Sequence, residues 1–208
     1  MKRVYYFVIL TILNFIFGIT SNKLLNSNKL LVDSLIEQFP TDQVQELLTF
    51  QQKWEWLTYV ILPLLLLLKI AIITAILDLG CFLFNKEIKY KKLFNIVVKA
   101  EFIFLLAIII KTAWFYFYQT NYTLEDLQYF YPFSALSLIG HEGLQPWFVY
   151  PFQVLNLFEL AYWFILAYLL GKELESTTDK GLSIVASSYG VGLLIWVVGV
   201  MFLTLNMS

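Results

Sequence analysis

The sequence predicts an all-α membrane protein, a polytopic bundle of five transmembrane helices in one integral membrane domain covering residues 1–208. The first observation is composition: 60% of the residues are hydrophobic and 14% are charged. Soluble domains average about 45–50% apolar and about 25% charged residues. A chain this small cannot hide so many apolar side chains in a core, because it must expose a large surface. The composition excludes a soluble enzyme, a secreted disulfide scaffold and a disordered tail.

The second observation is a series of apolar stretches, each near the length of about 20 residues that a bilayer-crossing helix needs. The expected spans are residues 4–19, 57–84, 96–118, 150–170 and 183–205. The first stretch, with Lys2 and Arg3 before it, also has the basic start of a signal peptide. No A-x-A cleavage motif follows it, so a first span is the preferred interpretation.

The third observation is the distribution of Lys and Arg between the connecting segments, which sets orientation in the membrane. With the N-terminus in the cytoplasm, the inner side holds Lys2, Arg3, Lys86, Lys89, Lys91, Lys92, Lys172 and Lys180. The outer side then holds only Lys23, Lys29 and Lys53. We therefore expect the N-terminus inside and the C-terminus outside. The preference for Lys over Arg favours a bacterial source, and hence a multi-pass protein of the cytoplasmic (inner) membrane with lipid around it.

The outer segment 21–56 is expected to form an amphipathic helical hairpin. Apolar residues recur with helical spacing on both sides of Pro40, which breaks the pattern, and Thr41 or Asp42 can cap the second helix. The apolar face either lies on lipid and on the bundle or docks a partner subunit. The residues expected to contact such a partner, together with Trp147 of the other outer segment, are Leu31, Leu35, Phe39, Leu47 and Trp54.

The second outer segment, residues 119–149, contains a short helix and a short apolar run. Thr123 to Asp126 has the pattern of a capped helix start. The apolar run 130–138 is too short to span, so we expect it to lie at the interface or to re-enter slightly. A turn with His141 and Glu142 follows, with Trp147 as an aromatic anchor.

Charged residues inside the expected spans predict an intramembrane polar cluster, because such residues are costly in lipid and usually face the bundle interior. Lys111 and Glu159 lie at matching depths, about 10 Å and 13 Å below the outer surface. We expect a salt bridge between them, with Lys69 and Asn156 in the same cluster. The cluster is either a structural pair or part of a proton or ion path. Glu101 can pair with a lysine of another helix.

The last span has small residues on one face, which favour close helix packing. The helix-packing residues are Ser188, Gly192 and Gly199, and the partner helix lies either in the same chain or in another protomer. The lone cysteine, Cys81, is expected to be a small buried packing residue.

No motif for catalysis, a metal or a cofactor is found. His141 is the only histidine, with no second histidine or cysteine near it in sequence. We therefore expect no enzyme, no metal, no cofactor and, at a net charge of −1, no nucleic-acid partner. The alternative enzyme, acting on a lipid-linked substrate, would require His141, Glu142, Glu125 and Asp126 to converge.

The second half of the chain resembles the Yip family of Ypt/Rab-interacting membrane proteins. The resemblance covers about residues 130–203 and rests on Pro132 to Leu138, Leu155 to Glu159, Trp163, Leu166, Gly171 and Lys180-Gly181. Asn156 stands where the family usually has Asp, and the long N-terminal region of eukaryotic members is missing. The resemblance implies a non-catalytic protein that organises other membrane machinery, such as an accessory component of an ABC-type exporter.

Three functions are therefore carried forward. The first is an accessory or scaffold subunit of a larger membrane transport or export complex, bound to other integral subunits in a hetero-complex. The second is a small transporter or channel that uses the Lys/Glu cluster. The third is the membrane enzyme.

Overall fold

The fold was analysed in a computed structural model, which describes residues 2–207. Met1 and Ser208 lie outside the described residues, as do the side chains of Lys2, Arg3 and Val4. The described chain is helical throughout and contains no strand. Its helices are α1 (Lys2–Leu24), α2 (Ser27–Gln38), α3 (Thr41–Leu83), α4 (Tyr90–Glu101), α5 (Ile103–Phe117), α6 (Leu124–Tyr129), α7 (Ala135–Ile139), α8 (Pro146–Val154), α9 (Leu157–Glu173), α10 (Thr178–Val185), the π-helical turn η1 (Ala186–Gly190) and α11 (Val191–Met207).

Four helical segments are long and apolar enough to cross a membrane, which confirms a membrane-type, all-helical architecture. They cover Tyr5–Leu24, Thr41–Leu83, Tyr90–Phe117 and Thr178–Met207. The expected fourth span, residues 150–170, is instead divided between α8 and α9. α8 continues through Pro151 to Val154, and the break comes after it, where Asn156 caps the start of α9.

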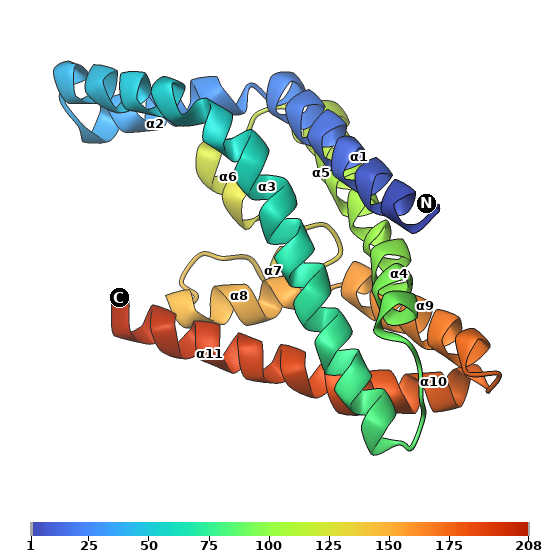
Figure 1. The fold of residues 1–208 in the computed structure, drawn as a ribbon. Helices are drawn as coiled ribbons and strands as arrows, with labels where there is room; N and C mark the ends of the chain where they lie inside the picture. Colours follow the sequence, from blue (N-terminus) through green and yellow to red (C-terminus); the bar gives the residue numbers. More distant parts are fainter. Residues whose placement is uncertain (1, 208) are drawn as a thin grey trace.

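The segment expected to be a hairpin followed by a separate span is built differently. α2 ends at Gln38 and α3 begins at Thr41, so the break at Pro40 is found, but α3 then continues for 43 residues. At 1.5 Å per residue, α3 contains about 65 Å of helix, but it is bent: its first part lies beside α2 and its longer part then turns away (Figure 1). No side chain caps the start of α3, so the expected cap by Thr41 or Asp42 is wrong; Pro40 occupies the N-cap position.

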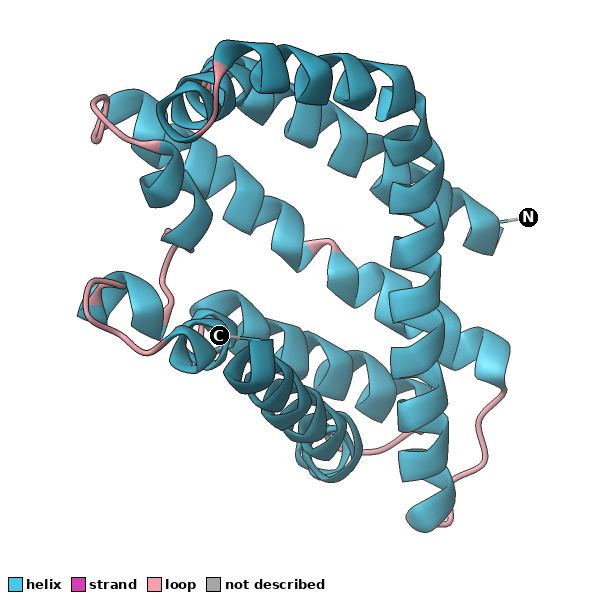
Figure 2. Ribbon diagram, turned by 90° about the vertical axis from the view of Figure 1, so that its left-hand side faces the viewer, coloured by secondary structure: helices cyan, strands magenta, loops and turns pink. Residues whose placement is uncertain are grey.

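Two helix pairs spread from a common base. α1 lies along α5, and α8 lies along α11 (Figure 1). The base is the region where these two pairs converge and where α3, α4, α9 and α10 meet. In the second view, α3 stands along one edge of the molecule (Figure 2). The main core lies in the base, and its largest fully buried side chains include Tyr162, Ile70, Leu77, Leu93, Leu166 and Leu170. The arms of α3 and α11 away from the base remain largely exposed.

The small residues of the last helical segment contact α3 within the same chain. A Cβ atom on Gly80 would lie 2.5 Å from the Ser188 side chain, and one on Gly192 would lie 3.0 Å from Ile76. Ser188 and Gly192 therefore support close packing, as expected. Gly199 makes no such contact within the described chain, because nothing lies within 4 Å of the position its Cβ would take, so its packing against another protomer stays a prediction.

Candidate functional site

Several polar side chains lie at similar distances from the ends of their helices at the base of the molecule. Lys69 lies 14 residues before the end of α3 at Leu83, and Glu101 lies 11 residues after the start of α4 at Tyr90. At 1.5 Å per residue, these positions are about 21 Å and 17 Å from the helix ends at the base. Glu159 lies 14 residues before the end of α9, about 21 Å, and Tyr189 lies 11 residues after Thr178, about 17 Å. The four side chains thus lie at similar distances, about 17–21 Å along their helices, from the helix ends at the base.

The four side chains Lys69, Glu101, Glu159 and Tyr189 are called the charged layer below. Lys69 and Glu101 form its ion pair. The Lys69 Nζ donates to Glu101 Oε2 at 2.8 Å, and it also lies 4.5 Å from the centre of the Phe104 ring. The Glu101 side chain is 3% exposed, whereas that of Lys69 is 47% exposed. The expectation that Glu101 pairs with a lysine from another helix is thus confirmed.

Glu159 is bound by aromatic side chains and not by Lys111. The Tyr189 hydroxyl donates to Glu159 Oε1 at 2.7 Å, and Trp163 Nε1 donates to the same oxygen at 3.0 Å. Lys111 Nζ instead donates to the backbone carbonyl of Leu127 in α6. The expected Lys111–Glu159 salt bridge is therefore wrong, because a matching depth does not fix the direction in which each side chain points.

Three of the helices that surround this layer are interrupted within it. α4 and α5 are separated by a turn at Phe102, α8 and α9 by the break before Leu157, and α10 and α11 by the π-helical turn. π-helical turns and broken membrane helices free backbone groups and redirect side chains, and they are frequent at binding sites. The π-helical turn places Tyr189 against Glu159.

Asn156 belongs to the wall of this site and not to its charged centre. Its Oδ1 accepts from the backbone N–H of Glu159 at 2.8 Å, and its Nδ2 donates to the carbonyls of Gln153 and Val154. These bonds close both ends of the break between α8 and α9. Asn156 thereby fixes the first turn of α9, which carries Glu159.

Removing this cap should loosen the break. We expect Asn156→Ala to lower the free energy of unfolding by about 1–2 kcal/mol, because one cap and two backbone carbonyls lose their partner. Asn156→Asp keeps the cap acceptor but places a carboxylate oxygen against the carbonyls of Gln153 and Val154, so it should lose at least as much stability. Thermal unfolding of the purified variants in detergent measures both. Equal stability of the alanine variant and the wild type would contradict the capping role.

The outer residues considered for catalysis converge only in part. His141 Nε2 lies 3.4 Å from Glu125 Oε1, and the His141 ring stacks on Tyr129 with 4.5 Å between ring centres. Asp126 is used in a capping box with Thr123, which confirms the capped start of α6. Glu142 is exposed in the turn beyond His141.

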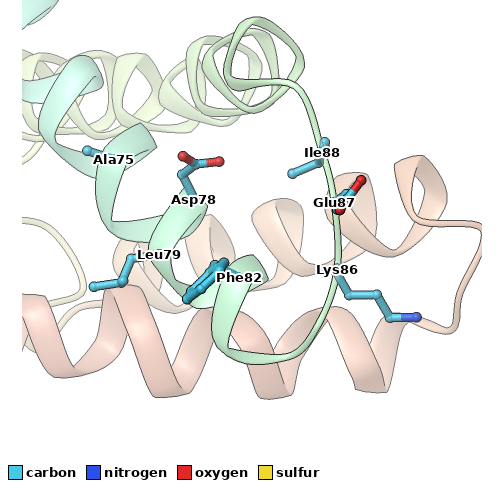
Figure 3. Close-up of a pocket in the computed structure, with 7 residues that line it drawn as sticks. All are labelled: Ala75, Asp78, Leu79, Phe82, Lys86, Glu87 and Ile88. Carbon is cyan, nitrogen blue, oxygen red and sulfur yellow. The ribbon is translucent and has the colours of Figure 1, made fainter.

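A separate surface pocket lies at the base end of α3 (Figure 3). Asp78 points from α3 toward the segment of Glu87 and Ile88, and the Lys86 ammonium points away from it (Figure 3). The pocket lining is Ala75, Asp78, Leu79, Phe82, Lys86, Glu87 and Ile88. Asp78 follows Lys69 by nine residues, about 14 Å along α3, so this pocket is distinct from the charged layer.

The residues expected to contact a partner differ in exposure. Phe39, Leu47 and Trp54 are exposed, at 43%, 46% and 42%. Leu31, Leu35 and Trp147 are half-buried. An open groove on this part of the chain is lined by Phe39, Gln43, Glu46, Leu47, Thr49, Phe50 and Lys53.

Sequence reasoning missed the aromatic half of the site. Tyr162, Trp163 and Tyr189 were not predicted as site residues, although Trp163 lies four residues after Glu159 and hence on the same helix face. The position of Tyr189 depends on the π-helical turn, for which the sequence carries no clear signal.

The fold and the charged layer define a class: a helical protein of membrane type, with a partly buried ion pair and a second carboxylate held by aromatic side chains. No protein-family model, curated protein or solved structure matches this chain. The resemblance to the Yip family therefore stays a prediction from sequence.

Proposed function

We propose that the chain is a non-catalytic subunit of the bacterial inner membrane that binds laterally to a larger membrane transport or export complex. The Yip resemblance suggests an ABC-type exporter as an example of such a complex. In this proposal α8 and α9 together form the fourth of five spans. From Pro146 to Glu173 they cover 28 residues, about 42 Å of helix, which is sufficient to cross a bilayer. The N-terminus is then cytoplasmic and the C-terminus is outside.

The observation that carries the proposal is the exposed apolar surface of α2 and the first third of α3. α2 has no buried residue, and the stretch of α3 before residue 57 buries only Val44. Phe50, at 63% exposure, lies in the groove with Phe39 and Leu47. Contiguous apolar surface that projects beyond the expected span indicates a protein contact.

The chemistry of the neighbouring surface supports an integral membrane partner. On the same side of α3 as the groove, Ile61, Leu65 and Leu68 are exposed further along the helix, on a face that would lie in lipid. A partner that covers the groove therefore also runs beside the bilayer. Lys53 and Glu46 at the groove provide polar contacts of both signs at its rim.

The test is purification of the tagged protein from its native membrane in mild detergent, followed by mass spectrometry. We expect a stoichiometric membrane subunit with the wild type. The double variant Leu47→Asp/Phe50→Asp should retain this membrane subunit at about one tenth of the wild-type level or less. The reason is that a buried charge in an apolar contact costs more than about 1.4 kcal/mol. The matched control Gln45→Asp/Gln52→Asp adds the same charges on the opposite face of α3 and should retain the partner. A clean monomer, or equal loss in both variants, would contradict the proposal.

A second function, a small transporter or channel, is favoured by one specific observation: three helices are interrupted at the depth of Lys69, Glu101 and Glu159. This function requires water to reach the layer. Cysteine substitution at Tyr162, followed by labelling with a membrane-impermeant thiol reagent, tests it. Labelling would favour the transporter, and protection together with a stable partner would favour the accessory subunit.

A further inference from the structure

The charged layer contains more acid than base. Glu101 and Glu159 supply two carboxylates, and Lys69 is the ammonium group that contacts either of them. Lys111, the other lysine of the expected cluster, is bound to a backbone carbonyl. If both carboxylates were ionised, the layer would carry a net charge of −1 among apolar side chains.

Glu159 forms no salt bridge among the described residues, and Lys69 acts on it only from beyond salt-bridge distance. Its bonds come from a phenol and an indole, and both are accepted by the single oxygen Oε1. Neutral donors stabilise a carboxylate less than a paired ammonium does. An unpaired ionised carboxylate in a low-dielectric interior is costly, and such groups are usually neutralised instead.

Tyr162 connects the two carboxylates. Its side chain is fully buried, and its hydroxyl interacts electrostatically with both Glu101 and Glu159. The Tyr162 hydroxyl also has a hydrogen-bond interaction with the Glu101 carboxylate. Tyr162 therefore links Glu101 to the surroundings of Glu159 inside the protein.

The surrounding titratable groups do not change this charge balance. Tyr131 lies near both carboxylates, and burial, with Glu159 and Glu101 contributing, raises the pKa of Tyr131 to about 12, so it is neutral. The titratable and charged groups that interact with Glu159 from the elements packed around it are Lys69, Glu101, Tyr131, Tyr162 and Tyr189. Only Lys69 among them is a cation.

A metal ion suits this site poorly. No group of three or more His, Cys, Asp or Glu side chains that could hold a metal occurs in residues 2–207. Calcium and magnesium need about six oxygen ligands, and the nearby Lys69 ammonium would repel them. A proton needs a single oxygen.

We propose that Glu159 is an exchangeable proton-binding site, which holds one proton near neutral pH while Glu101 stays ionised beside Lys69. The proton resides on the Glu159 carboxyl group, whose Oε1 accepts from Tyr189 and Trp163. This inference holds for an accessory subunit as well as for a transporter, because it depends only on the charge balance of the layer. Its failure would leave the partner-binding groove on α2 and α3 unaffected.

Infrared spectroscopy of the purified full-length protein in lipid nanodiscs tests the proposal. Near neutral pH, where exposed carboxyl groups are ionised, we expect one carbonyl band from a protonated carboxylic acid. The band should shift in heavy water, because the acid proton exchanges, whereas lipid ester carbonyls do not shift. Glu159→Gln should abolish the band, and the amide oxygen can still accept from Tyr189 and Trp163, so the fold is preserved. Glu142→Gln, at an exposed position, should leave the band unchanged.

Lys69→Met provides a second variant with the opposite expectation. Without the ammonium, Glu101 should also take up a proton, so the band should increase about twofold. A band that is absent from the wild type, or that persists in Glu159→Gln, would overturn the proposal. No increase in folded Lys69→Met would also overturn it, because the charge balance would then not control protonation.

Discussion

Replacing Lys69 with methionine should cost about 3 kcal/mol of unfolding free energy. The substitution keeps the length and apolar stem of the side chain and removes only the ammonium that binds Glu101 Oε2. Removing one partner of a buried ion pair typically costs about 3–5 kcal/mol, because the other charge is left uncompensated. The lower end applies here, because Lys69 is half exposed and Glu101 can take up a proton. Unfolding in mixed detergent micelles, followed by tryptophan fluorescence, measures the loss.

The ion pair should respond asymmetrically to its two single substitutions. Glu101→Gln leaves the half-exposed Lys69 without a partner, and this side chain can move toward lipid headgroups or water, so the loss should be smaller than that of Lys69→Met. The double variant Lys69→Met/Glu101→Gln has no buried charge at this position and should recover about half of the loss. Additive losses in the double variant would show that the two side chains do not interact.

The sequence showed which charged side chains lie in the apolar segments, but the partners of each charge were only partly predictable. Counting residues placed Lys111 and Glu159 at one level, and the structure indeed keeps both inside the protein. Depth is only one coordinate, and the rotation of each helix about its axis decides what a side chain meets. Lys111 faces α6 and donates a hydrogen bond to the Leu127 carbonyl oxygen. The hydropathy pattern placed α6 in a segment outside the spans.

Helix interruptions were predictable where a residue type dictates them. Pro40 marks the end of α2, and the spacing of Asn156 and Glu159 is that of a cap and the third residue of a helix. The π-helical turn at Ala186–Gly190 has no such signature, since it depends on how α3 and α9 contact the last helical segment. Hydropathy alone also joined α8 and α9 into one span, because both are equally apolar.

The closest helix contact in the base should be the least tolerant of added volume. A Cβ atom on Gly181 of α10 would overlap the Ala167 carbonyl oxygen of α9 and would lie 3.1 Å from the Gly171 nitrogen. Both obstacles are backbone atoms, which cannot move aside as a side chain can. We therefore expect Gly181→Ala to force α9 and α10 apart and to cost about 3 kcal/mol, at the upper end for overpacking.

Gly199→Ala is the matched control for this prediction. Gly199 lies in the helical interior of α11, and its Cβ would meet open space. The alanine variant should therefore be about 0.5–1 kcal/mol more stable than the wild type, because glycine loses more backbone entropy on forming a helix. The same substitution thus has opposite signs at the two sites, and the unfolding midpoints in one detergent compare them directly. If Gly199→Ala lost as much stability as Gly181→Ala, the cost would reflect the general loss of glycine and not the contact between α9 and α10.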